Sequence, residues 1–202
     1  MAILLFILSL IVLGAILIIG LRNLDYFLNL TRPITSETMI MEGWVPDYMK
    51  KEICQHYWRG QYKRLIVTGG PIMQGFFLSE YRTYANLGAA TMIALGIDPH
   101  EVVAVSAPLV DSYRTAAAAS SLKAYMLNLG IASCNIYTLG SHARRSYFIF
   151  RQVLGPDIAV GIIAMPDDRY RSDRWWSTSI GFRMVIAEAL AYFYMRLIPL
   201  GK

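Results

Sequence analysis

The chain has 202 residues, of which 55% are apolar and 16% are charged, and its formal net charge is +5. This mild charge comes without a basic run or an interleaving of aromatic and basic side chains, which argues against a nucleic-acid-binding protein. The two cysteines, Cys54 and Cys134, lack the spacing of a metal site or a redox motif, so we expect two buried free thiols.

The N-terminal segment is the most apolar part of the chain. Residues 2–21 carry no charge, and Ser9 is their only polar side chain. Twenty helical residues span roughly 30 Å, the thickness of the hydrocarbon core of a bilayer. The run is too long for a signal peptide and lacks a basic start and a small-residue cleavage site. We therefore expect residues 1–22 to be an uncleaved transmembrane anchor, with a buried core helix as the alternative.

Two basic residues, Arg22 and Arg32, flank the C-terminal end of the anchor. By the positive-inside rule, this arrangement favours a cytoplasmic domain. Residues 23–35 are expected to form a short tether. Residues 36–198 are expected to form one domain, because about 160 residues suffice for a single hydrophobic core.

Four glycines divide this domain in a repeating pattern. Gly60, Gly96, Gly130 and Gly155 each end a helical pattern and precede a short run rich in valine and isoleucine. We expect these glycines to end helices in the left-handed conformation, and the runs to be strands buried on both faces. With a first strand in residues 37–44, five strands alternate with helices, and a last helix is expected over residues 179–197.

This alternation predicts an α/β fold with a mostly parallel five-stranded sheet and helices on both faces. Ligands of such folds bind beyond the carboxyl ends of the strands. One segment there is Thr68-Gly69-Gly70, whose backbone could approach a ligand closely and offer N–H groups to an anion; a tight turn is the alternative. Neither a dinucleotide-binding glycine fingerprint nor a P-loop is present.

A second segment is the start of an alanine-rich helix at Arg114 and Thr115. Thr115 is the expected N-cap of this helix, with a ligand contact as the alternative. A cation such as Arg114 opposes the helix dipole, and this placement is unfavourable unless an anion is bound there.

The third segment is TLGSHARRS, residues 138–146. Ser141 is the expected N-cap, which would place His142, Arg144 and Arg145 in the first helical turn with no acidic partner. A bound anion would explain this concentration of positive charge. His142, whose usual pKa is near neutrality, is also a candidate general acid or base. The alternative is an arginine pair that forms salt bridges with acids further along the chain, Asp167, Asp168 or Asp173.

Several segments together resemble the ElyC/SanA/YdcF family of bacterial envelope proteins: MEGWVPDY, LIVTGGP, SEYRTYANLGAATMIALGI, YRTAAAASSLKAY, TLGSHARRSYFIF and VGIIAMPDDRYRSDRWWSTSIGFRMVIAEALAYFY. The resemblance covers nearly all of residues 36–197. It implies a Rossmann-like three-layer sandwich and a role in envelope integrity and in peptidoglycan or lipid-carrier metabolism. It also implies a bacterial inner (plasma) membrane location with the domain outside the cytoplasm, against the charge argument.

The resemblance implies site residues by position: Glu42 after the first strand, the turn Gly69-Gly70, the pair Arg114-Thr115, and an H-x-x-R element formed by His142 and Arg145. The chain departs from the family pattern at LVDSYRT, where more basic versions are usual. The family carries no settled reaction.

We therefore expect a membrane-anchored enzyme or binding protein of envelope biogenesis whose ligand is a phosphate-bearing lipid carrier or peptidoglycan-related precursor. His142 and Glu42 are the expected acid and base. The expected anion-binding residues are Thr68, Gly69, Gly70, Arg114, Thr115, Ser141, Arg144 and Arg145. The residues indicate no metal site and no particular cofactor.

Two other functions are consistent with the same residues. One is a module that binds S-adenosylmethionine or another nucleotide-like ligand, although the glycine fingerprint is missing. The other is a non-catalytic scaffold for envelope assembly, with residues 174–176 and the last helix as its partner surface.

Overall fold

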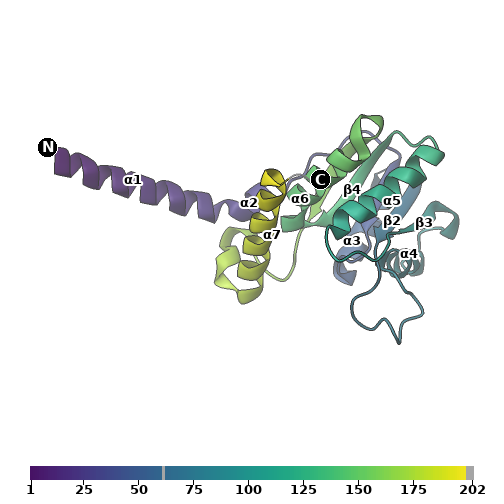
Figure 1. Ribbon diagram of the computed structural model, residues 1–202. Coiled ribbons are helices and arrows are strands. Elements are labelled where there is room, and N and C mark those ends of the chain that lie inside the picture. The colour runs from purple at the N-terminus through teal and green to yellow at the C-terminus, as the bar shows by residue number, and fades with distance from the viewer. Residues whose placement is uncertain (61, 199–202) are drawn as a thin grey trace.

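The computed structural model describes residues 1–60 and 62–198 (Figure 1). Its centre is a five-stranded sheet in the order β3-β2-β1-β4-β5, in which every neighbouring pair is parallel. The strands are β1 (Thr38–Glu42), β2 (Arg64–Gly69), β3 (Val102–Ser106), β4 (Ser133–Leu139) and β5 (Ala159–Met165). The predicted α/β fold with five strands is confirmed, and the sheet is entirely parallel.

Helices cover both faces of this sheet. Successive residues of a strand point to opposite faces, so Met39 and Met41 pack under α3 and α4, whereas Ile40 packs under α5 and α6. The longer helices are α1 (Ala2–Arg22), α3 (Asp47–Arg59), α4 (Tyr84–Ala94), α5 (Arg114–Asn128), α6 (Ala143–Leu154) and α7 (Ser179–Leu197). The short ones are α2 (Leu24–Leu28) and the 3-10 turns η1 (Pro99–Glu101), η2 (Gly140–His142), η3 (Gly155–Asp157) and η4 (Ser172–Ser177).

Three of the four helix-ending glycines have a positive φ, but Gly155 has a ψ of −157° and so is not in the predicted left-handed helical conformation. Gly96, Gly130 and Gly155 have φ of +105°, +64° and +69°. Gly60 differs, with φ of −89°. A Cβ at Gly60 would lie 2.8 Å from the His56 carbonyl oxygen, so the position needs a glycine for close packing and not for a positive φ.

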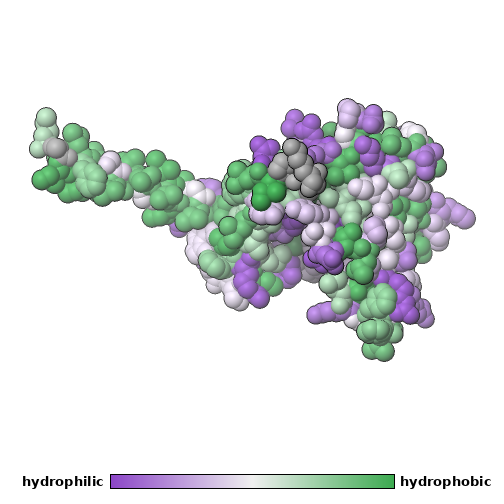
Figure 2. Space-filling model, viewed as in Figure 1, coloured by the Kyte–Doolittle hydropathy of each residue, from purple (hydrophilic) through white to green (hydrophobic). Residues whose placement is uncertain are grey.

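The helix α1 leaves the domain as an isolated rod (Figure 1). It is long and apolar enough to span a membrane, and none of its apolar stretch is buried. Figure 2 shows it as a continuous hydrophobic cylinder beside a domain of mixed surface. The alternative of a buried core helix is therefore wrong for this chain.

The residues expected to form a tether are instead packed onto the domain. In α2, Leu28 and Asp25 are completely buried, and Asp25 accepts a hydrogen bond of 2.8 Å from the Tyr170 hydroxyl. Arg32 then pairs with Ile162 at the open edge of β5 through two backbone hydrogen bonds of 2.7 and 3.1 Å. The packed unit therefore begins at α2 and not at residue 36.

Candidate functional site

A cavity of about 890 Å³ opens beyond the carboxyl ends of the strands. It lies where the sheet order changes direction, because β1 is followed along the chain by β2 on one side and is paired with β4 on the other. Such a switch point is the usual ligand site of an open parallel sheet. Residues from the ends of β1 and β2, the starts of α5 and α6, and the second half of α7 line the cavity.

Glu42, the last residue of β1, lies in this cavity with only 3% of its surface exposed. Its Oε2 atom accepts hydrogen bonds from the hydroxyl groups of Ser146, at 3.0 Å, and Thr138. Burial alone would raise the pKa of Glu42, but the charge of His142 and these hydrogen bonds outweigh burial and lower it. Glu42 is therefore a carboxylate at neutral pH.

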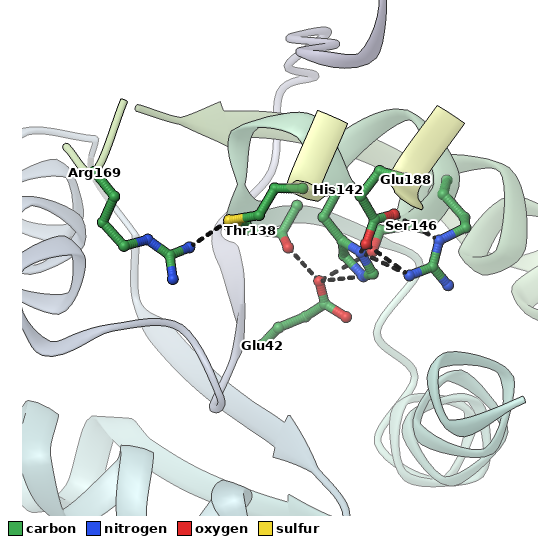
Figure 3. Close-up of polar contacts among 8 residues, drawn as sticks. Glu42, Thr138, His142, Ser146, Arg169 and Glu188 are labelled. Atoms are coloured by element: carbon green, nitrogen blue, oxygen red, sulfur yellow. Dashed lines mark hydrogen bonds and ion pairs between the residues drawn. The ribbon is translucent and has the colours of Figure 1, made fainter. Parts of the chain in front are cut away.

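His142 follows β4 and lies between two carboxylates (Figure 3). Its Nδ1 atom is 3.0 Å from Glu188 Oε1, and its Nε2 atom is 3.6 Å from Glu42 Oε2. Burial alone would lower the pKa of His142, but Glu42 and Glu188 outweigh burial and raise it to about 9. The raised pKa favours the imidazolium at neutral pH, and the Arg145 Nη2 atom also lies 2.9 Å from the same Nδ1 atom. The Nε2 atom of His142 is buried and has no hydrogen-bond partner among the described residues.

Glu188, on α7, holds Arg145 as well as His142. The Arg145 Nε and Nη2 atoms donate to its two carboxylate oxygens at 2.8 and 3.1 Å, a bidentate geometry. Burial alone would raise the pKa of Glu188, but His142 and Arg145 outweigh burial and lower it to about 2. The cluster thus balances two cations, His142 and Arg145, with two anions, Glu42 and Glu188.

Sequence reasoning missed Glu188, although the sequence contains a signal for it. It is the only acidic residue in the expected last helix and stands in the apolar stretch VIAEALAY. A carboxylate among apolar helix residues is rarely buried without a partner. This rule predicts that Glu188 has a cationic partner, but it does not identify that partner.

The structure corrects the expectations for TLGSHARRS. Ser141 does not cap α6, because β4 passes into the turn η2 and α6 begins only at Ala143, without a side-chain cap. Ser141 is completely buried and does not line the cavity. Arg144 points away from the cavity, with its guanidinium 3.9 Å from the centre of the Phe27 ring and its Nε donating to the Phe27 carbonyl oxygen.

The expectation that these cations have no acidic partner is also wrong, since Glu188 faces His142 and Arg145. Two of the three aspartates considered as alternatives are paired elsewhere. Asp167 accepts hydrogen bonds from Arg169 and Tyr48, and Asp173 forms a salt bridge with Arg171. In Figure 3, Arg169 stands apart from the His142 cluster.

The start of α5 forms another wall of the cavity. Tyr113, with a φ of 57°, is the N-cap residue, so the prediction that Thr115 caps this helix is wrong. Arg114 and Thr115 line the cavity, and the first turn of α5 contains neither a capping side chain nor an acid. The first N–H groups of a helix have no partner within it, so this wall offers amide donors together with the Arg114 guanidinium.

The segment Thr68-Gly69-Gly70 also lines the cavity. The Thr68 hydroxyl donates to the Val105 carbonyl oxygen at 3.1 Å, so it already has a structural partner. A Cβ at Gly69 would lie 2.9 Å from Tyr84, which shows that this glycine lets α4 pack closely. A Cβ at Gly70 would have no atom closer than 3.7 Å, so Gly70 borders open space.

Within the described residues, no group of three or more His, Cys, Asp or Glu side chains is arranged to hold a metal ion. No protein-family model matches the chain, and a search of curated proteins finds no match. Membership of the ElyC/SanA/YdcF family therefore stays a prediction from the sequence motifs.

Proposed function

We propose that this chain is a membrane-anchored protein of bacterial envelope biogenesis. In this proposal, its cavity binds a phosphate-bearing precursor and His142 transfers a proton to it. The observation that carries the proposal is the buried His142, which lines the same cavity as the start of α5 and whose Nε2 atom has no hydrogen-bond partner among the described residues. The motif resemblance supplies the biological setting.

The start of α5 is the proposed phosphate site. Glu42 and Glu188 balance the charges of His142 and Arg145, whereas Arg114 is exposed and stands at a helix N-terminus. An anion at this place would be stabilised by Arg114, by the free N–H groups of the first turn and by the helix dipole. This differs from the site expected at the start of α6.

Proton transfer is the proposed role of the Glu42–His142 pair. A general acid must hold its proton at the operating pH, and the raised pKa of His142 meets this requirement. His142 donates its Nε2 proton to an oxygen of the ligand and is left as a neutral imidazole. Glu42, at 3.6 Å, holds the imidazolium ready for the next transfer.

The loop between β2 and α4, residues 70–83, favours a precursor that carries an apolar tail. Met73 lines the cavity, and Phe77 and Leu78 in the same loop are 92% and 94% exposed. Figure 2 shows the tip of this loop as a hydrophobic projection from the domain. A prenyl phosphate has the polar head and the apolar chain that would suit these two regions.

The test is the thermal stability of the full chain in detergent micelles, with phosphate, farnesyl phosphate, S-adenosylmethionine or chloride at matched ionic strength. A ligand at a hundred times its Kd adds about 2.7 kcal/mol to the unfolding free energy. Both phosphates should raise the melting temperature of wild type and of the exposed-arginine control Arg151→Gln, but not that of Arg114→Gln.

Farnesyl phosphate should stabilise wild type more than inorganic phosphate does, and Phe77→Ser/Leu78→Ser should remove this difference. Equal phosphate shifts in wild type and Arg114→Gln would contradict the proposed site. Stabilisation by S-adenosylmethionine alone would favour the nucleotide-like module instead, and no shift with any ligand would favour the scaffold.

A further inference from the structure

A residue late in the chain touches the end of the apolar helix. Arg22, the last residue of α1, places its guanidinium 5.5 Å from the centre of the Trp176 ring in η4. The end of an apolar helix marks the depth at which the chain leaves the hydrocarbon core of a bilayer. If α1 spans a membrane, Trp176 is therefore held at the boundary between lipid and water.

The surface around Trp176 is built of aromatic rings on a rigid support. Trp176 and Phe182 are 37% and 52% exposed, and both pack on Trp175, which is 3% exposed. The centre of the Trp175 ring lies 5.7 Å from the centre of the Trp176 ring and 6.1 Å from that of the Phe182 ring. Because a buried ring holds them, these two exposed rings keep a fixed position. Aromatic side chains, tryptophan above all, are enriched at membrane interfaces.

The segment that carries these two rings is rich in arginine. Arg171 just before η4, Arg174 on η4 and Arg183 in the first turns of α7 are exposed, and Arg22 contacts Trp176 of the same segment. The acid among them is Asp173, which pairs with Arg171 at 2.8 Å and lies 3.8 Å from Arg174. Four arginines against one aspartate leave this surface positive, which complements the charge of anionic lipid headgroups.

We propose that Arg171, Arg174, Trp176, Phe182 and Arg183, here called the interfacial face, lie in the headgroup layer of an anionic bilayer. This inference rests on the proposed anchoring by α1 and gives the domain a second contact with the same membrane. The face is continuous with the end of α1, and Figure 1 shows α7 beside α2, where α1 leaves the domain.

The interfacial face and the cavity share helix α7. Phe182 and Glu188 lie on the same helix, and Glu188 lines the cavity. At 1.5 Å per residue, Glu188 is about 9 Å further along α7 than Phe182. The cavity therefore begins about 9 Å along α7 from the interfacial face.

Fluorescence quenching tests this placement with the full chain. The protein is reconstituted in nanodiscs of phosphatidylglycerol and phosphatidylcholine whose acyl chains carry bromine near the headgroups. Trp58, which is 57% exposed on α3, provides a matched control for Trp176. Brominated lipid should quench part of the wild-type emission. The drop in emission caused by brominated lipid should be much smaller in Trp176→Phe than in wild type. In Trp58→Phe the drop should be as large as in wild type.

A charge-reversal variant tests the role of the arginines. Arg174→Glu/Arg183→Glu changes two exposed side chains, so it should fold, and its quenching should fall below that of wild type. Unchanged quenching in Trp176→Phe, or its absence in wild type, would overturn the proposal. Co-elution with the nanodiscs tests the anchor separately, and the phosphate shift tests the cavity separately, so each proposal can fail alone.

Discussion

His142 lies between two carboxylates that are far apart in the sequence, Glu42 of the first strand β1 and Glu188 of the last helix α7. Each carboxylate favours the charged imidazole, and each is itself stabilised by it. Removing one member of such a buried cluster leaves a charge without compensation, which costs about 3–5 kcal/mol. At the residue scale, the site is a set of mutually dependent charges, so substitutions in it should not be additive.

The first consequence concerns the pKa of His142. In Glu188→Gln the imidazole loses one negative neighbour, so its pKa should fall from about 9 towards its ordinary value of 6.5. Histidine proton NMR of the full chain in micelles measures this pKa directly. Glu101→Gln removes an acid that accepts a hydrogen bond from Tyr57 and should leave the pKa of His142 unchanged. An unshifted pKa in Glu188→Gln would mean that Glu188 does not hold the imidazolium.

The stability of the fold should depend on pH in two windows. His142 has a raised pKa in the folded state, so its contribution is complete below pH 6.5 and is lost as the pH rises through about 9. Glu188 has a lowered pKa, so its contribution is complete above pH 4.5 and is lost as the pH falls towards about 2. Urea unfolding at a series of pH values should show both losses. His142→Gln should be less stable at neutral pH but should lack the alkaline decline, and a decline equal to that of wild type would contradict this assignment.

Helices α2 and α7 are the elements that join the N-terminus to the site. The two helices pack on each other, with Phe27 stacked on Phe193 at 6.3 Å between ring centres. The Arg144 guanidinium of α6 packs on the Phe27 ring of α2. Helix α2 therefore also contacts the helix that carries Arg145. Although α2 is short, it is part of the support of the site.

A pair of truncations tests this role of α2. A chain that begins at Asn23 loses only α1, whose apolar stretch is unburied, so it should unfold cooperatively with the stability of the full chain. A chain that begins at Pro33 also loses the completely buried Leu28. Removing a buried leucine side chain alone costs about 2–5 kcal/mol, so this second chain should melt well below the first. Equal melting temperatures would show that residues 23–32 are a tether after all.

The elements were predictable from the sequence because their signals are local. Valine- and isoleucine-rich runs mark β2 and β3, and the last helix has its expected bounds of Ser179–Leu197. The partners of side chains were not predictable, since Glu188 meets His142 only after α7 folds back over the site. The predictions that Ser141 and Thr115 are N-caps were wrong, because capping rules describe the start of an isolated helix. In the structure, β4 runs into the turn η2 before α6 begins, and Tyr113, with its positive φ, is the residue before α5.

At the scale of the whole molecule, the chain consists of one apolar rod and one three-layer domain that meet at Arg22 and Trp176 (Figure 1). The rod carries no charge between Ala2 and Leu21, and all charged side chains lie from Arg22 onward. A helix of this length and composition is stable in hydrocarbon because all of its backbone groups bond within the helix.

A membrane-spanning α1 predicts how the protein behaves in cell extracts. Full-length protein should stay in the membrane pellet through an alkaline carbonate wash, because a transmembrane helix is held by its apolar surface and not by charge. The chain that begins at Asn23 should move to the supernatant in the same wash, since carbonate removes surface contacts such as those of the interfacial face. Full-length protein in the supernatant would rule out the transmembrane anchor.

The bridge between Arg32 and Ile162 has a further consequence for release of the domain by proteolysis. β5 is an edge strand of apolar residues, and the Arg32 backbone occupies hydrogen-bonding groups on its open side. Unpaired groups on an apolar edge recruit strands from other molecules and lead to aggregation. A cut before α2 would release a domain in which Arg32 still covers the open edge of β5. A cut after Ile34 would shed one with a bare edge, so the position of cleavage would decide between a soluble product and an aggregate.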